Sequence, residues 1–195
     1  MGLHAAFGFL SIILSIAAFA PYFWSIHKKE TQPHLYSWAI WVLIQGTAVW
    51  IMFAEGAGWG ASGLAVGTFL CVCVSLISLR YGTKNITRFD TLCFFGAFIA
   101  FAMYTFVREP YTSLAIVIFI ELCGFFPTFR KAIADPDSEA TVTWGIFSVS
   151  NVFSLLAIEK VALLTVAYPA VLLITETSLA MLLVLLKWRT RRREA

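Results

Sequence analysis

The chain has 195 residues, of which 60% are hydrophobic and 13% are charged, and its formal net charge is +3. Soluble domains carry about 25% charged residues, so this composition predicts an integral membrane protein without a separate soluble domain. No basic patch interleaved with aromatic residues lies outside the apolar segments, so we expect a lipid bilayer as partner and no nucleic acid.

Seven apolar segments follow one another along the chain. Several of them have roughly the 17–25 residues that are needed to cross about 30 Å of hydrocarbon. We therefore predict an all-α protein with seven transmembrane helices. In chain order the segments are approximately Ala5–Trp24, Tyr36–Phe53, Ala61–Arg80, Asp90–Val107, Ser113–Phe129, Ala140–Ala157 and Leu163–Leu186.

The basic residues are distributed unevenly over the loops that join these segments. With the N-terminus outside, only Arg108 and Lys160 face the outside. The other twelve face the cytoplasm: Lys28, Lys29, Arg80, Lys84, Arg88, Arg130, Lys131, Lys187, Arg189, Arg191, Arg192 and Arg193. This bias follows the positive-inside rule. We expect a bacterial plasma membrane, an outside N-terminus and a cytoplasmic C-terminus whose basic tail contacts lipid headgroups.

Part of the first half of the chain recurs 106 residues later without a gap. The matching pairs include Pro21 and Pro127, Phe23 and Phe129, Trp38 and Trp144, Trp41 and Phe147, Ser37 and Thr143, and Gln45 and Asn151. This spacing predicts two parallel three-helix repeats joined by a linker helix. We assign residues 1–82 to the first repeat, 83–109 to the linker helix, and 110–195 to the second repeat with its basic cytoplasmic tail.

The segments PYFWSIHKKETQPHLYSWAIW and PTFRKAIADPDSEATVTWGIF resemble the two signature regions of the PQ-loop and SWEET-like transporter superfamily. The resemblance implies a bundle of three helices, one linker helix and three helices that carries solutes. The chain departs from the family pattern in three ways, one of which is Glu139 where sugar carriers have a proline near the start of the second helix of the second half. Its signature pairs are Pro21-Tyr22 and Pro127-Thr128 where the family has Pro-Gln, and the third helix of each half lacks asparagine. The missing proline and asparagines argue against sugar as the cargo.

Four polar side chains fall at similar depth, near the middles of four predicted helices: Gln45, Glu121, Asn151 and Glu176. A charged group at the bilayer centre costs about 2.5–3.5 kcal/mol, so such residues face the bundle interior or a wet cavity. Secondary transporters bind their substrates near the midplane, at the interface between repeats. These residues therefore predict a substrate pocket.

Helical spacing adds aromatic rings to this pocket. Trp38, Trp41 and Gln45 lie within an arc of about 60° on one helix. The same arc recurs in the second half at Trp144, Phe147 and Asn151. Each half thus presents two rings and one amide, which can stack on a ring-shaped solute and hydrogen-bond to it. For Trp38 and Trp144 the alternative is a place in the aromatic belt at the membrane interface.

The two carboxyl groups belong to the second half alone, because the repeat pairs Glu121 with Ser15 and Glu176 with Leu70. Our hypothesis is that one or both bind a proton during turnover or neutralise a cationic solute. The alternative is a protonated glutamic acid that donates a hydrogen bond between helices.

Two prolines at matching positions, Pro21 and Pro127, predict kinks near the cytoplasmic ends of the first and fifth helices. Each kink is either a hinge of a cytoplasmic gate or a fixed bend.

The remaining motifs indicate neither a metal site nor an enzyme. All four cysteines lie in apolar segments, and Cys71 and Cys73 are about 200° apart on a helix, so we expect no metal, disulfide or cofactor. No catalytic dyad or metal-binding motif lies at membrane depth, which argues against an enzyme.

The sequence thus predicts a transporter of a small polar solute, one that is ring-containing or cationic, working by alternating access. The alternative is a non-transporting receptor or assembly protein on the same scaffold. The oligomeric state stays open.

Overall fold

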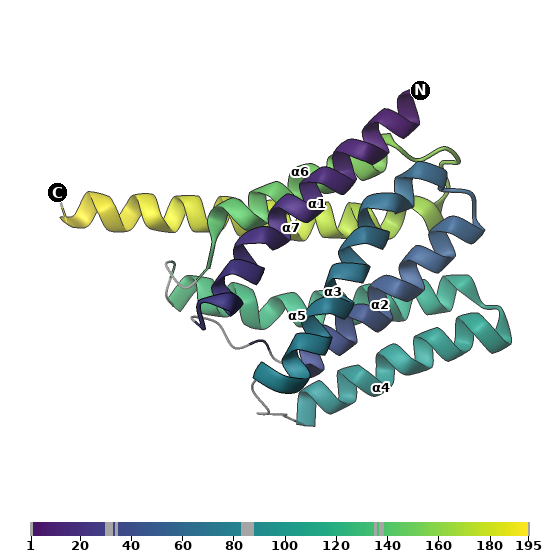
Figure 1. Cartoon of the computed structure of the whole chain (residues 1–195), viewed down its shortest axis with the longest axis horizontal. Coiled ribbons are helices and arrows are strands. Elements are labelled where there is room, and N and C mark those ends of the chain that lie inside the picture. Colours follow the sequence, from purple (N-terminus) through teal and green to yellow (C-terminus); the bar gives the residue numbers. More distant parts are fainter. Residues whose placement is uncertain are drawn as a thin grey trace.

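The computed structural model of the chain describes residues 2–29, 33, 35–82, 88–134, 136 and 139–194. Within these residues the protein is all-helical and contains no strand (Figure 1). Its seven α-helices are α1 (Leu3–His27), α2 (Leu35–Ala54), α3 (Ser62–Tyr81), α4 (Arg88–Ala102), α5 (Pro110–Ala134), α6 (Thr141–Leu156) and α7 (Leu163–Glu194). Each predicted segment overlaps one of them, so the predicted all-α protein of seven helices is confirmed.

Two short helical segments adjoin the longer helices. The 3-10 helix η1 (Gly58–Ala61) leads into α3, and the π-helix η2 (Met103–Val107) continues α4. After η2 the chain turns through Arg108, whose φ of 57° is in the left-handed region, before α5 begins. The fourth predicted segment is therefore an α-helix that ends as a π-helix.

The last helix extends beyond the predicted membrane segment. That segment ends at about Leu186, and α7 continues through the basic tail to Glu194 and projects beyond the other helices (Figure 1). No Gly or Pro interrupts this stretch, and Leu, Lys and Arg all favour the helix. The guanidinium of Arg192 lies 3.9 Å from the ring centroid of Trp188, which gives the last turns a local contact of their own.

In the part of the chain that the structure describes, four helical stretches are long and apolar enough to cross a membrane: Leu3–Trp24, Ser37–Ala54, Gly58–Tyr81 and Leu163–Arg189, with mean hydropathies between 1.5 and 2.1. Three more apolar stretches are shorter, at Phe94–Val107, Pro110–Phe125 and Thr141–Leu156. A span of hydrocarbon takes about 20 residues of helix. The four long helices suggest a membrane protein.

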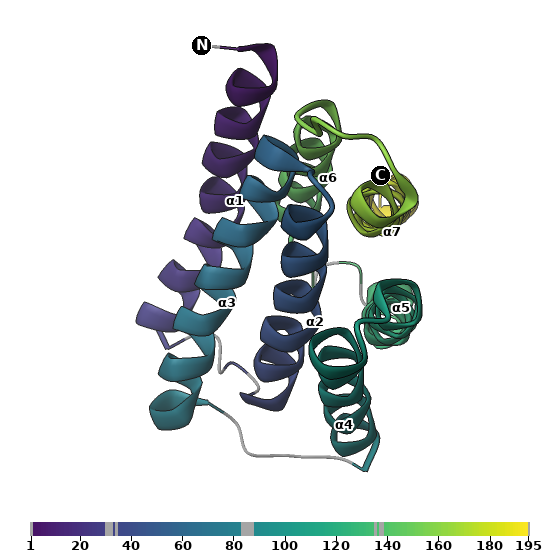
Figure 2. The ribbon, with the colours of Figure 1, turned by 90° about the vertical axis from the view of Figure 1, so that its right-hand side faces the viewer.

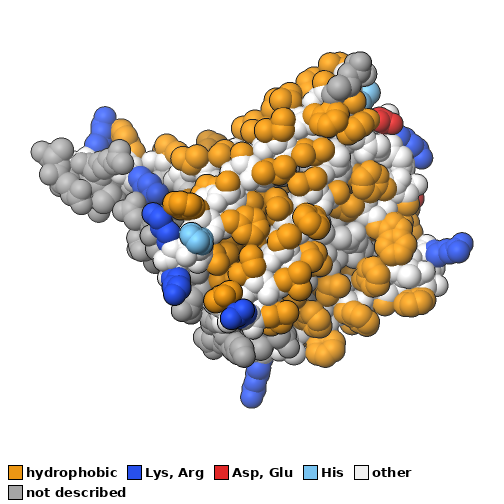
Figure 3. All heavy atoms as spheres, viewed as in Figure 1, with side chains coloured by type: hydrophobic (Ala, Val, Ile, Leu, Met, Phe, Trp, Pro, Cys, Tyr) orange, Lys and Arg blue, Asp and Glu red, His pale blue; other side chains and the backbone are white. Residues whose placement is uncertain are grey.

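The outer surface of the helices is apolar. Figure 3 shows hydrophobic side chains across the middle of one face, with Lys and Arg side chains gathered at its edges. Large apolar side chains such as Phe69, Leu92, Phe106 and Phe119 are between 65% and 82% exposed. Soluble proteins rarely expose apolar patches of this kind, whereas lipid-facing helices do.

The two halves of the chain pack their helices in the same order. In the first half α3 contacts both α1 and α2, and in the second half α7 contacts both α5 and α6. Figure 2 shows α3 between α1 and α2, and α7 between α5 and α6. The halves meet where α6 contacts α1 and where α2 contacts α5, and α4 packs against α2 and α5.

Successive helices run in alternating directions, so the molecule has two ends (Figure 1). We call one the basic end, because Lys28, Lys29, Arg80 and Arg88 lie at helix termini there, and Lys187 of α7 contacts the chain just before α6. The opposite end holds the start of α1 and the connections α2–η1, η2–α5 and α6–α7. Lys84 of the α3–α4 connection lies outside the described residues.

Candidate functional site

A cavity of about 580 Å³ lies between the two halves. Small-molecule sites in proteins commonly have about 300–1,000 Å³, so this cavity has room for a metabolite. Its described lining comes from α1, α2, α3, α5, α6 and α7, and from the residues just before α6, with none from α4. On α6 the lining residues recur at helical spacing, and they are Thr143, Trp144, Phe147, Ser150, Asn151 and Ser154. Each helix thus turns one face toward a shared space.

The structure brings together nearly every residue that the sequence singles out. The cavity is lined by all six predicted substrate-binding residues (Trp38, Trp41, Gln45, Trp144, Phe147 and Asn151), by both glutamates (Glu121 and Glu176), and by Pro21. The remaining predicted residue, Pro127, lies in α5, and its side chain is outside the described part of the chain. The roles of these residues stay predictions.

The cavity opens at the basic end. Glu139 and Ala140, which precede α6, line it there together with Thr128 of α5 and Ser37 of α2. Ala140 is exposed, so this side of the cavity reaches the surface. Its lining extends inward to Gly63 of α3.

A cluster of buried hydroxyl groups closes the cavity beyond Gly63. Ser11 Oγ lies 2.7 Å from Ser154 Oγ and 3.2 Å from Ser150 Oγ, and Ser15 Oγ lies 3.1 Å from Ser150 Oγ. Ser15 also donates to the carbonyl oxygen of Gly63 at 3.1 Å. A Cβ atom at position 63 would clash with the Ser11 hydroxyl, so this closure requires glycine. The cluster joins α1, α3 and α6.

A second contact closes the opposite end itself. The backbone N–H of Glu159, in the α6–α7 connection, donates to the carbonyl oxygen of Ala57 at 3.1 Å, and its carboxylate accepts from the N–H of Trp59 at 3.4 Å. Gly58, with φ of +55°, and Gly60 permit this approach, because a Cβ atom at either position would clash with Glu159 or Ile158. The two halves are therefore in backbone contact at the end remote from the opening.

The two buried carboxyl groups have different partners. Glu121 is 2% exposed, and its Oε2 accepts a hydrogen bond of 2.8 Å from the hydroxyl of Tyr168, which is fully buried in α7. Glu176 is 6% exposed, and its Oε2 accepts from Nδ2 of Asn151 at 2.8 Å. The same Nδ2 donates to the carbonyl oxygen of Phe147 at 3.2 Å. Both carboxyl groups thus link α7 to a neighbouring helix.

The two tryptophans that could have belonged to an interfacial belt both line the cavity. Trp38 is 9% exposed; its indole N–H donates to the hydroxyl of Tyr22 at 3.2 Å, and its ring centroid lies 5.0 Å from that of Trp41. The indole N–H of Trp144 donates to Oε2 of Glu139 at 3.2 Å. Since each indole donates to a residue that also lines the cavity, neither is turned out toward lipid.

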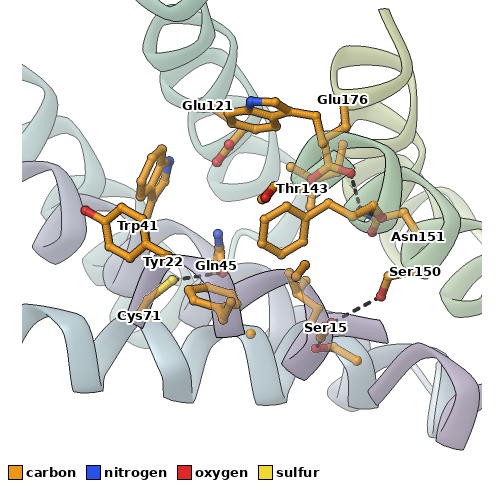
Figure 4. Close-up of a pocket in the computed structure, with 18 of the residues that line it drawn as sticks. Ser15, Tyr22, Trp41, Gln45, Cys71, Glu121, Thr143, Ser150, Asn151 and Glu176 are labelled. Atoms are coloured by element: carbon orange, nitrogen blue, oxygen red, sulfur yellow. Dashed lines mark hydrogen bonds between the residues drawn. The ribbon is translucent and has the colours of Figure 1, made fainter. Parts of the chain in front are cut away.

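Figure 4 shows three polar side chains directed toward the same open space: Gln45 from α2, Thr143 from α6 and Glu121 from α5. The indole of Trp41 lies beside them. The amide oxygen of Gln45 faces the thiol of Cys71 at 3.8 Å, so its Nε2 is the group left facing the cavity. Among the described residues Nε2 has no hydrogen-bond partner. The centre of the cavity therefore offers an amide, a hydroxyl and a carboxyl group.

Sequence reasoning missed several lining residues, among them Phe19, Tyr22, Cys71 and Phe125. It also did not identify Tyr168 as the hydrogen-bond partner of Glu121 behind the lining. Phe19 and Phe125 could have been found, because they also match at an offset of 106 residues. Thr143 was paired with Ser37 by the same offset, yet it was not assigned to the pocket. Tyr168 lies two turns before Glu176 on α7, which places it near the same face.

Comparison of the chain with protein-family models, with curated proteins and with solved structures finds no match.

Proposed function

We propose that the protein is a membrane carrier of the PQ-loop and SWEET-like type that moves a small solute by alternating access. The observation that carries this proposal is a cavity between the halves that is open at the basic end and closed at the opposite end. A carrier needs a site that reaches one side at a time, and a cavity with one open end fits that requirement.

The packing order supports an internal repeat. The contacts of α3 with α1 and α2 match the contacts of α7 with α5 and α6, as expected for parallel three-helix repeats over residues 1–82 and 110–195. The helix α4, within residues 83–109, then serves as the linker. Gln45 and Asn151, which pair in sequence, both line the cavity between the halves. Carriers built from repeats place their substrate at such an interface.

Charge fixes the orientation of the proposed carrier. The positive-inside rule assigns the basic end to the cytoplasm, so all seven helices span the membrane with the N-terminus outside. The cavity then faces the cytoplasm, and the serine cluster with the Glu159 contact forms the closed outer side. Pro21, inside α1 at the mouth of the cavity, is suited to act as a hinge of the inner gate.

The test is solute flux in proteoliposomes. Purified protein is reconstituted into vesicles loaded with a metabolite mixture, and the solutes released are identified by mass spectrometry. We expect release of a small set of related compounds, reduced at least about tenfold by Asn151→Leu, which removes a cavity amide. Val149→Leu, an exposed position on the same helix, is the matched control. Binding of a metabolite without release would instead identify a receptor on the same scaffold.

A further inference from the structure

The ionisable side chains that line the cavity are of one charge type. The carboxyl groups of Glu121, Glu139 and Glu176 line it, and the described lining contains no Lys, Arg or His. Inside a protein, where the effective dielectric constant is low, a carboxylate attracts a cation and repels an anion far more strongly than in water. The deep part of the cavity therefore favours a cation over an anion, whereas at the mouth Nζ of Lys187 lies 3.1 Å from the carbonyl oxygen of Glu139.

The two deep carboxyl groups are not equally available to such a solute. Glu176 is held by the amide of Asn151, which is itself fixed by its second hydrogen bond to Phe147. Glu121 takes one hydrogen bond, from Tyr168, and its carboxyl group is directed toward the open centre beside Gln45 and Thr143. Of the two deep carboxyl groups, Glu121 is thus the one directed toward the open centre of the cavity.

Aromatic rings surround the same centre. Trp41 lies beside the polar side chains, and Phe147 is positioned by an edge-on contact with Phe19, whose centroid is 5.4 Å away. Both rings line the cavity. Aromatic faces stack on flat rings and attract cations through their negative quadrupole. A cavity of about 580 Å³ is also far larger than an inorganic ion needs.

We infer that the cavity binds an organic cation that contains a flat ring. Its charged group lies at Glu121, its ring lies against Trp41 and Phe147, and its polar substituents meet the amide of Gln45 and the hydroxyl of Thr143. This inference rests on the proposed function only in taking the cavity as the solute site. Thr143 is its additional specificity-determining residue, and Tyr168 is the residue that positions Glu121.

The test compares three compounds that share one ring and differ in charge. Tryptamine, tryptophol and indole-3-acetate share an indole and present an ammonium, a hydroxyl and a carboxylate, and butylammonium is a cation without a ring. Binding to the full chain in lipid nanodiscs is measured by calorimetry at neutral pH. We expect tryptamine to bind at least about tenfold more tightly than tryptophol or butylammonium, and more tightly still than indole-3-acetate. Equal binding of the three indoles, preference for the carboxylate, or binding of none of the probes by folded protein overturns the inference.

Two matched variants locate the charge preference. Glu121→Gln keeps the shape of the side chain and an acceptor for Tyr168, and it should reduce the preference for tryptamine over tryptophol about tenfold. Glu109→Gln makes the same change at an exposed residue outside the cavity and should leave the preference intact. A preference retained in Glu121→Gln overturns the assignment of the charged group. In a separate variant, Trp41→Leu, the binding affinity for tryptamine should fall toward the affinity for butylammonium.

The outcomes separate this inference from the proposed carrier. Tryptamine binding that depends on Glu121, without flux in proteoliposomes, retains the cation site and rejects the carrier. Flux of a neutral or anionic solute through the same cavity retains the carrier and rejects the cation site. If Glu121→Gln changes only the pH dependence of uptake and leaves the charge preference intact, Glu121 binds a proton and the inference is wrong.

Discussion

The hydroxyl of Tyr168 donates a 2.8 Å hydrogen bond to Oε2 of Glu121, although the two residues are 47 positions apart in sequence. Both side chains are at most 2% exposed, and they join α5 to α7 beside the cavity. The carboxyl group that faces the centre of the cavity is therefore held by a neutral donor rather than by a basic side chain.

Removing this donor should weaken both the fold and the site. In Tyr168→Phe the buried carboxyl oxygen loses its partner, so we expect the free energy of unfolding to fall by about 1–3 kcal/mol. Thermal unfolding in detergent measures the change. Tyr81→Phe is the control, because Tyr81 is 56% exposed and its hydroxyl contributes no buried hydrogen bond. Equal melting temperatures for the two variants would contradict a structural role for the Tyr168 hydroxyl.

The hydrogen bond between Asn151 and Glu176 should appear as coupling in a double-mutant cycle. Asn151→Leu leaves the Glu176 carboxyl group without its donor, and Glu176→Leu removes one of the two acceptors of the amide and leaves the carbonyl oxygen of Phe147. We expect the double variant to be more stable than the sum of the two single changes predicts, by about 0.5–3 kcal/mol.

The repeat supplies the control for this cycle. Gln45 is the counterpart of Asn151 in the first half, but Leu70 stands where the second half has Glu176. Gln45→Leu combined with Glu176→Leu should therefore be additive to within about 0.3–0.5 kcal/mol. Additive behaviour in the Asn151 cycle as well would show that the contact contributes nothing to stability.

The closure at the opposite end should depend on glycine at position 60. A Cβ atom there meets the backbone of Ile158, so Gly60→Ala cannot keep the present approach of η1 to the α6–α7 connection. We expect this variant to favour a form open at the opposite end. Gly145→Ala is the control, because a Cβ atom at Gly145 meets nothing within 4 Å.

Native Cys71, which lines the cavity, can report on this change. With Cys73, Cys93 and Cys123 replaced by alanine, a membrane-impermeant maleimide is added to either side of oriented vesicles. We expect Cys71 to react from the side of the basic end in the parent and from the opposite side in Gly60→Ala. The same sidedness in both would show that the Gly60 contact does not hold the cavity closed.

The proline inside α1 should affect rate more than stability. Pro21 removes one helical hydrogen bond near the mouth of the cavity, and α1 continues to His27 beyond it. Pro21→Ala restores the bond and straightens the helix, so we expect unchanged or higher thermal stability. If Pro21 is a hinge, transport should slow about tenfold, equivalent to about 1.4 kcal/mol in the barrier. An unchanged rate would identify a fixed bend instead.

The helices could be predicted because each one corresponds to a continuous run of apolar residues, which is recognisable without knowing any contact to another part of the chain. The matching positions across the repeat, such as Gln45 and Asn151, could be predicted because rare residues keep one offset. Both amides do line the cavity. Residue type and periodicity were therefore enough to predict most of the side chains that line the cavity.

Contacts between distant helices could not be predicted from residue type. Serines in helices usually bond to their own backbone, so nothing in the sequence indicated that Ser11, Ser15, Ser150 and Ser154 would bond to one another. The partner of Glu121 depends on how α7 is rotated against α5. The sequence predicted the end of the last membrane segment but not the end of α7, because Lys and Arg mark a membrane boundary and also favour the helix.

The serine cluster has a consequence for how the bundle separates. If α1 and α6 part at the opposite end, the surfaces that become wet carry hydroxyl groups, which exchange their bonds to one another for bonds to water at little net cost. An apolar seam of the same area would resist hydration. Separation of α1 from α6 at this end therefore costs less in hydration than separation of an apolar seam of the same area would.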